Sequence, residues 1–237
     1  MYLNILISRH RSLYSVGSQF QRADLIHLTS RISTAIQSVL RRSKDPARSL
    51  LKDLELLMDT KKFSDVTLIA GAQEFRAHKT ILAARSAVFS AMFEHEMEER
   101  KHNRVVITDM DEKVVEEMLW FVYTSKVPNI KEIADSLLVA ADKYALDSLK
   151  LMCQESLAKS LAIANAAHVL VLAHIHSCDW LKTQAIKFIT QYTTDVMNTE
   201  DFKLAVTSHP HLIAEILRAK TIKANDDLDE AMLAQYC

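Results

Sequence analysis

The chain has 237 residues, of which 49% are hydrophobic and 25% charged, and its formal net charge is −1. These proportions are those of an ordinary globular protein rather than a disordered or fibrous one, and the length allows one large or two modest domains. A net charge near zero gives no global attraction to nucleic acid or to an acidic membrane, so any partner must be recognised locally. The two glycines and three prolines are too few for an all-β protein, which indicates that helix dominates.

The beginning of the chain differs in composition from the rest. Residues 1–44 are rich in serine and basic side chains and contain a single acidic residue, Asp24. This composition is typical of a mitochondrial transit peptide, and it is equally that of a basic, poorly ordered arm. We prefer the second interpretation and predict that the arm covers residues 1–46, with Pro46 marking its end.

The segment from Arg48 to Asp59 predicts an amphipathic helix. Leu50, Leu54 and Leu57 recur at positions i, i+4 and i+7, which places them on one helix face. Such an apolar stripe has to be covered, either by the helix's own domain or by a second protein.

A β-hairpin is predicted next. Residues Ser64–Ala70 alternate apolar and polar side chains, Gly71 turns the chain, and the sequence EFRAH (Glu74–His78) returns. We interpret His78 as a structural histidine with satisfied hydrogen bonds rather than as a ligand.

Two short helices and a third strand follow the hairpin. Thr80–Ala84 and Ala87–Phe93 are rich in helix formers, and Ser86 is placed to cap the second of these helices. The β-branched run Arg104–Thr108 predicts a strand, after which Asp111 can cap another helix. This region is therefore expected to mix α and β structure.

The second half of the chain is predicted to be helical. Asn129 and Glu132 are spaced as a capping box, which indicates that a helix starts after Pro128. The tail, residues 223–237, is acidic and expected to fray. Further helices are predicted over residues 147–158, 164–176, 179–192, 199–206 and 209–220.

An uncharged run from Leu161 to Cys178 is long enough to be considered as a membrane span. Asn165, His168 and His174 argue against that interpretation, because each would be costly in hydrocarbon. We therefore interpret the run as a buried core helix.

Motifs of the common enzyme classes are missing from the sequence, which contains no GxGxxG, GxxxxGK[ST], HExxH or GxSxG. His174, His176 and Cys178 stand two residues apart, but a helix brings only the first and third to one face, and structural zinc needs four ligands. Nothing around Cys153 marks a lowered thiol pKa, so we interpret it as a packed thiol rather than a nucleophile. We predict no enzymatic activity, no cofactor and no metal.

The stretch HEMEER (His95–Arg100) sets one methionine, Met97, among polar and charged residues. A solvated charged loop is the simplest interpretation, but it leaves the methionine unexplained. A flexible thioether among charges suits the hydrophobic pocket of a partner, which predicts a protein-binding anchor.

The segment Phe63–Pro128, together with Ala141–Cys153, resembles a BTB (POZ) domain, in particular that of the speckle-type POZ proteins. The stretches NAAHVLVLAHIHSCDWLKTQAIKFI and VTSHPHLIAEI resemble the BACK helices of the same family. The resemblance implies an α+β fold, in which a small sheet with helical hairpins is followed by all-α BACK helices. It places the BTB domain at residues 48–155 and the BACK-like region at 156–222.

The same resemblance implies a partner. Speckle-type POZ proteins are adaptors that hold the cullin-3 scaffold of a ubiquitin ligase through a hydrophobic residue, any residue and Glu, a motif that Met97, Glu98 and Glu99 match. Phe93 and Tyr144 fall at positions that flank the cullin surface. The chain is then expected to be a non-enzymatic adaptor in ubiquitin-dependent degradation, located in the nucleus or cytoplasm and binding neither nucleic acid nor membrane. Mitochondrial import by the basic arm is the alternative location.

Homodimerisation is also implied by the resemblance. Asp65 and Lys79 match the charged pocket of the BTB dimer interface, where we expect an ion pair to favour specificity rather than stability. Apolar positions match the same interface, although leucines that cover the domain's own core would show the same pattern. These positions are Leu50, Leu54, Leu57 and Ile81.

Two further features bear on assembly. The segment SHPHLIAEILRAK matches a second self-association surface, with Leu217 where the family usually carries tyrosine. Speckle-type POZ proteins carry a substrate-binding MATH domain before the BTB domain, and residues 1–46 are too few for one and do not resemble it. The alternative function is therefore that the chain forms heterodimers with MATH-bearing relatives and modulates their ligase activity.

Overall fold

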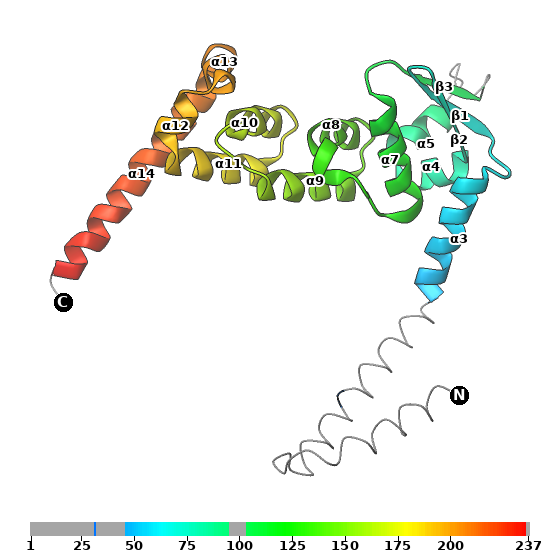
Figure 1. Ribbon diagram of the computed structural model, residues 1–237, viewed down its shortest axis with the longest axis horizontal. Coiled ribbons are helices and arrows are strands. Elements are labelled where there is room, and N and C mark those ends of the chain that lie inside the picture. Colours follow the sequence, from blue (N-terminus) through cyan, green and yellow to red (C-terminus); the bar gives the residue numbers. More distant parts are fainter. Residues whose placement is uncertain (1–30, 32–45, 95–102, 236–237) are drawn as a thin grey trace, which may run out of the picture. The chain divides into compact units, whose positions relative to one another are not determined.

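The computed structural model describes residues 31, 46–94 and 103–235, with side chains up to residue 222. The chain divides into two compact units, residues 1–52 and 53–237. The described part of the first unit comprises Arg31 and the start of helix α3 (Pro46–Thr60). All other described elements belong to the second unit, shown from cyan to red in Figure 1.

A three-stranded sheet with the order β2-β1-β3 opens the second unit. Strands β1 (Val66–Ala70) and β2 (Gln73–Ala77) pair antiparallel, which confirms the predicted hairpin. Gly71 turns the chain between them with a φ of +55°, where a Cβ would meet the Glu112 carboxylate at 2.7 Å. Strand β3 (Arg104–Ile107) pairs parallel to β1, as expected for a strand reached through a crossover.

The crossover contains α4 (Lys79–Arg85) and α5 (Ala87–Glu94), which confirms the two short helices predicted there. Helices α7 (Glu112–Thr124), α8 (Ile130–Lys143) and α9 (Asp147–Lys159) follow β3. Helix α7 contacts α4 and α8, and α8 packs on α9, so the core runs from the sheet into these helices. Figure 1 shows α7 beside the sheet with α8 and α9 following it.

The rest of the described chain is helical, as the sequence indicates. Helices α10 (Ala166–Ile175) and α11 (Asp179–Gln191) pack on each other, and α11 also contacts α9 and α14. Helix α10 is largely buried, which confirms that the uncharged run is a core helix. In the described part of the chain, the structure has no helix that combines the length and apolar character of a membrane span.

The end of the chain departs from the predicted pattern in two places. The short helix α12 (Thr193–Met197) lies between the predicted segments 179–192 and 199–206 and was not anticipated, because five residues carry too little periodicity. Helix α13 (Glu200–Ser208) matches the second of these segments. Helix α14 runs from Pro210 to Gln235, so the tail predicted to fray continues the helix instead.

The helix caps that the sequence predicts for α7 and α8 are not formed in the structure. Asp111 precedes α7 but its side chain makes no capping hydrogen bond. Asn129 does not cap α8 either, because its side-chain amide donates to the buried carboxylate of Glu117. Glu132 forms an exposed ion pair with Lys113 at 2.6 Å instead of returning to the helix start. The buried Glu117 therefore holds the start of α8 from a neighbouring helix.

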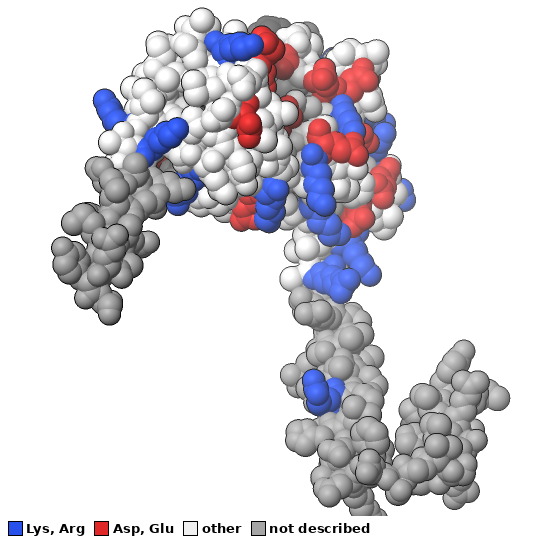
Figure 2. All heavy atoms as spheres, turned by 60° about the vertical axis from the view of Figure 1, so that its left-hand side comes forward, with Lys and Arg blue, Asp and Glu red and all other residues white. Residues whose placement is uncertain are grey.

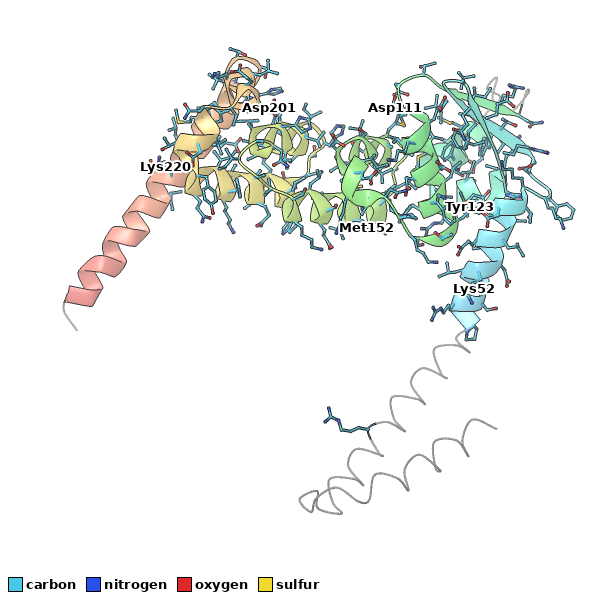
Figure 3. The ribbon with its side chains drawn as sticks, in the orientation of Figure 1. Lys52, Asp111, Tyr123, Met152, Asp201 and Lys220 are labelled. Atoms are coloured by element: carbon cyan, nitrogen blue, oxygen red, sulfur yellow. The ribbon has the colours of Figure 1, made fainter. Side chains whose placement is uncertain are left out.

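His78 is a buried structural residue, as predicted. Its ring Nε2 lies 2.7 Å from the Lys62 carbonyl oxygen, which can only accept, so this nitrogen carries the proton. The Tyr123 hydroxyl then donates to Nδ1 at 2.7 Å and accepts from the His78 backbone N–H at 3.0 Å. Burial raises the pKa of Tyr123 to about 12, which keeps this hydroxyl protonated. Tyr123, on α7, is labelled in Figure 3.

Ser86 joins the crossover helices to the end of α8. Its buried hydroxyl donates to the Tyr144 carbonyl oxygen at 2.6 Å and accepts from the Phe89 N–H at 3.1 Å. The second bond is the helix cap that the sequence predicts. The phenyl ring of Phe89 stacks on the Tyr144 ring with centroids 4.5 Å apart. The hydroxyl thus connects residues 58 positions apart in the chain, and the aromatic pair joins the same two segments.

We expect Ser86→Ala to lower the free energy of unfolding by about 1–3 kcal/mol, because it leaves a buried donor and a buried acceptor without their partner. Chemical denaturation at fixed protein concentration measures this change. Ser90→Ala is the control, because the Ser90 hydroxyl makes an exposed bond to Glu94 and its loss should cost no more than about 0.5 kcal/mol. Equal losses in the two variants would contradict the role assigned to Ser86.

Candidate partner-binding surfaces

The first surface lies at the end of α5. Phe93 is half-buried, stacks on Phe89 with centroids 6.0 Å apart, and lies 5.6 Å from the Lys79 ammonium. The helix ends at Glu94, and the described chain resumes at Asn103, directly before β3. The predicted anchor residues Met97 and Glu99 fall between these points, in residues 95–102, and so lie outside the described residues.

Tyr144 lies in the core behind this surface and does not line it. Its side chain is 1% exposed, packed on Phe89, and burial raises the pKa of its hydroxyl to about 12. This corrects the prediction that Tyr144 flanks a partner, because a covered ring cannot contact one. The sequence alone does not distinguish the covered Tyr144 from Phe93 at the surface, and only the fold does.

The second surface is formed by α3. None of the residues of this helix, all of which the structure describes, is buried. Leu54 and Leu57 are half-buried, whereas Leu50 is 59% exposed. Within the second unit, Met58 packs against the core and Glu55 pairs with Lys126 at 3.4 Å. The leucine stripe is therefore only partly covered within a single chain.

Ile81 on α4 differs from the leucines. It is half-buried and packs against the hydrophobic core of its own chain. Part of its surface is thus already used, and the remainder is available to a partner. Its place in a dimer interface stays a prediction.

Phe63 is a candidate site residue that the sequence reasoning missed. Its side chain is 90% exposed, although it lies only three residues after the end of α3. Its φ of +62° is in the left-handed region, which is costly for a bulky residue. The neighbouring Lys62 carbonyl is bound by His78, so this strained turn is held in place from inside the domain. The signal that could have revealed it is an aromatic residue at the polar start of a strand.

Within one chain, Asp65 and Lys79 are joined through the backbone rather than through an ion pair, and their pairing in a dimer interface stays a prediction. The Asp65 carboxylate accepts a hydrogen bond of 2.8 Å from the backbone N–H of Lys79, the first residue of α4. The Lys79 ammonium donates to the Asn103 side-chain oxygen. Among the ion pairs between described residues, none joins these two side chains. Asp65 is an anion placed at a helix N-terminus, where the backbone dipoles stabilise it.

A third surface lies on α14. Leu212 and Ile216 are buried and fasten this helix to its own chain, while Leu217 is 60% exposed. Leu204 on α13 is also exposed. The position of Leu217 is compatible with the predicted self-association surface, which the structure of one chain does not test.

The two described cysteines are buried. Burial raises the pKa of the Cys153 thiol to about 12, and it also raises that of Cys178, so neither thiol is activated. Groups of three or more metal-binding side chains close enough to hold an ion do not occur in the described chain. Figure 2 shows basic and acidic side chains mixed on the right-hand part of the visible face, with a largely uncharged area to their left.

Comparison with known proteins identifies both halves of the second unit. Residues 54–161 match the family model of the BTB/POZ domain, and residues 165–217 match that of the BPM/SPOP BACK domain. Among solved structures, the BTB domain of zebrafish PATZ1 is 31% identical, with a TM-score of 0.42, and the similarity covers 47% of this chain and 91% of that one. The two family matches meet after α9, and domains of these types are generally non-catalytic.

A double-mutant cycle tests the assignment of Asp65 as a helix cap. Asp65→Ala should cost about 0.5–2 kcal/mol of stability, as loss of a cap does, whether residue 79 is lysine or methionine. The coupling energy between Asp65→Ala and Lys79→Met should therefore stay below about 0.5 kcal/mol. Denaturant unfolding of the four proteins measures it. A clearly larger coupling would contradict the assignment of Asp65 as a cap alone, because it would show that the two side chains interact.

Proposed function

This chain joins a BTB/POZ domain to a BACK domain of the BPM/SPOP type, and from that premise we propose that it is a dimeric adaptor of a cullin-3 ubiquitin ligase. In this role it carries no active site of its own. It links the cullin scaffold to substrates or partners in the nucleus or cytoplasm. The observation that carries the proposal is the motif Met97-Glu98-Glu99, three residues after α5 in a chain with this domain order.

The chemistry of the motif supports binding through a small interface. One apolar side chain ringed by charged residues concentrates binding energy at a single point, because its burial is favourable and the surrounding polar groups keep water out. Met97 supplies the apolar group, and its unbranched thioether adapts to the shape of a groove. Glu99 supplies a carboxylate that a partner can bind through backbone N–H groups or basic side chains.

The described residues next to the motif give it a firm base. Phe93 closes α5 with its ring supported by Phe89, and Phe89 is itself stacked on the buried Tyr144. A rigid aromatic stack at this end of α5 lowers the entropic cost of binding nearby. Phe93 is thus proposed as a direct contact, and Tyr144 as its support.

Dimerisation is proposed through the surface of α3. An amphipathic helix with no buried residue leaves apolar area in water, and the same area on a second copy can cover it. Leu50, Leu54 and Leu57 form the stripe. We add Phe63 to the interface because its phenyl ring, three residues after α3, is 90% exposed and would also be stabilised if a partner covered it. A relative with an equivalent helix could bind the same apolar surface, so this surface also serves the alternative in which the chain forms heterodimers.

We expect Met97→Asp to weaken binding to purified cullin-3 by about 30-fold or more, since loss of a central anchor costs roughly 2 kcal/mol or more. Calorimetry with the full chain measures the affinity, and circular dichroism and dimer mass should be unchanged. Met97→Leu is the matched control, because it keeps an apolar group of similar size and should bind within a few-fold of the original protein.

Undiminished binding of the Met97→Asp protein would contradict the proposal. So would an equal loss in Met97→Leu, because the anchor would then be sensitive to shape alone. Loss of helical content in Met97→Asp would instead show that the residue packs within its own domain, which also contradicts its role as an outward-facing anchor.

A further inference from the structure

Three histidines meet where α14 begins. His174 lies on α10, His209 is the last residue before α14, and His211 is its second residue. The ring centroids of His174 and His211 are 4.6 Å apart, and His209 lies 6.1 Å from the first and 6.0 Å from the second. The sequence separates His174 from His211 by 37 positions, so the fold alone creates this cluster.

The contact between His174 and His211 allows only one proton at its centre. Their Nε2 atoms face each other at 2.9 Å, a hydrogen-bond distance between two nitrogens of the same kind. One ring must donate N–H, and the other must accept with a bare nitrogen, which only a neutral imidazole has. When both rings are protonated, two N–H groups and two positive charges face each other, and the bond cannot exist.

The charged groups around this contact oppose a second proton. Lys182 on α11 approaches the cluster and is paired with Glu215 on α14 at 2.8 Å. His209, whose Nδ1 lies 2.9 Å from the Ser208 hydroxyl, adds a third imidazole. Burial, the Lys182 charge and the other two histidines lower the pKa of His174, and Glu215 partly offsets them. The balance of the neighbouring groups therefore favours neutral His174.

We propose that the His174–His211 pair is a pH-sensitive link that fastens the start of α14 to α10 near neutral pH and releases it in acid. The link is closed while one ring stays neutral. Protonation of both rings opens it and loosens the first turns of α14. Leu217, six residues after His211 on the same helix, then changes its surroundings with pH, although Leu212 and Ile216 keep the helix buried on its other side.

The direction of the effect follows from the protonation equilibrium. A histidine whose pKa is lower in the folded state binds fewer protons there than in the unfolded chain, whose imidazoles have pKa values near 6.5. The stabilisation is thus complete above that value and is lost as the pH falls through the lowered pKa. An ordinary exposed histidine would contribute no such dependence.

Proton NMR of the imidazole rings in the full chain tests the pairing directly, with EDTA present so that no metal bridges the two nitrogens. His174 and His211 should titrate in two coupled steps. In His211→Asn, the His174 ring should titrate in a single step at higher pH than in the original protein. His168→Asn is the matched control, because His168 lies on the same helix outside the cluster and its replacement should leave both titrations unchanged.

Hydrogen exchange of the amides in the first turns of α14, corrected for the intrinsic effect of pH, tests the mechanical consequence. Protection should be unchanged above about pH 6.5 and should fall as the pH is lowered below that value, because the second proton enters the pair only below the ordinary imidazole pKa. His174→Asp should reverse this trend, because a carboxylate binds protonated His211 more tightly than neutral His211. A single uncoupled titration of each ring, or the same loss of protection in His174→Asp, would overturn the proposal.

Discussion

The contact between Ser86, Phe89 and Tyr144 is the constraint on which the proposed partner surface depends. It ties the crossover helices of a small sheet to the end of α8, a helix from the following part of the domain. Because the Phe93 ring stacks on Phe89, the same contact also holds the end of α5 in place. Strand β3 is held independently by its parallel pairing with β1. The described residues on either side of the proposed anchor thus belong to well-connected elements.

A second constraint is the apolar surface that one chain leaves in water. Most amphipathic helices bury their stripe against their own core, whereas α3 has no buried residue and ends near a strained, exposed phenylalanine. Strain of this kind persists only when the surroundings hold it, and here His78 and Tyr123 do so from inside. Because the backbone is held here, the exposed ring starts from a defined point, and less entropy is lost when a partner binds it.

The elements of the fold were largely predictable from the sequence because their signals are local. Alternation in Ser64–Ala70 and the turn at Gly71 specified the hairpin, and helical periodicity specified the helices of the second half. The errors arose where distant residues decide. Asn129 looks like a helix cap in the sequence until Glu117 is known to lie beside it, and the sequence does not show that the Asp65 carboxylate binds the backbone N–H of Lys79.

The candidate sites show the same division. Resemblance to a family identified α3 and the motif at Met97, but it could not tell that Tyr144 is covered or that Phe63 is bare. The histidines were noticed as neighbours along one helix, His174 with His176, whereas the structure pairs His174 with His211. Side chains that face each other across helix contacts leave no periodic trace in the sequence.

Sedimentation equilibrium of the purified chain tests most directly whether the uncovered surface of α3 serves assembly. The account predicts twice the 26.9 kDa mass of one chain at micromolar concentration. It predicts a shift toward single chains in Phe63→Asp but not in Leu56→Asp, whose leucine is 61% exposed on the opposite face of the helix. A monomeric original protein, or a dimer that is indifferent to Phe63→Asp, would contradict it.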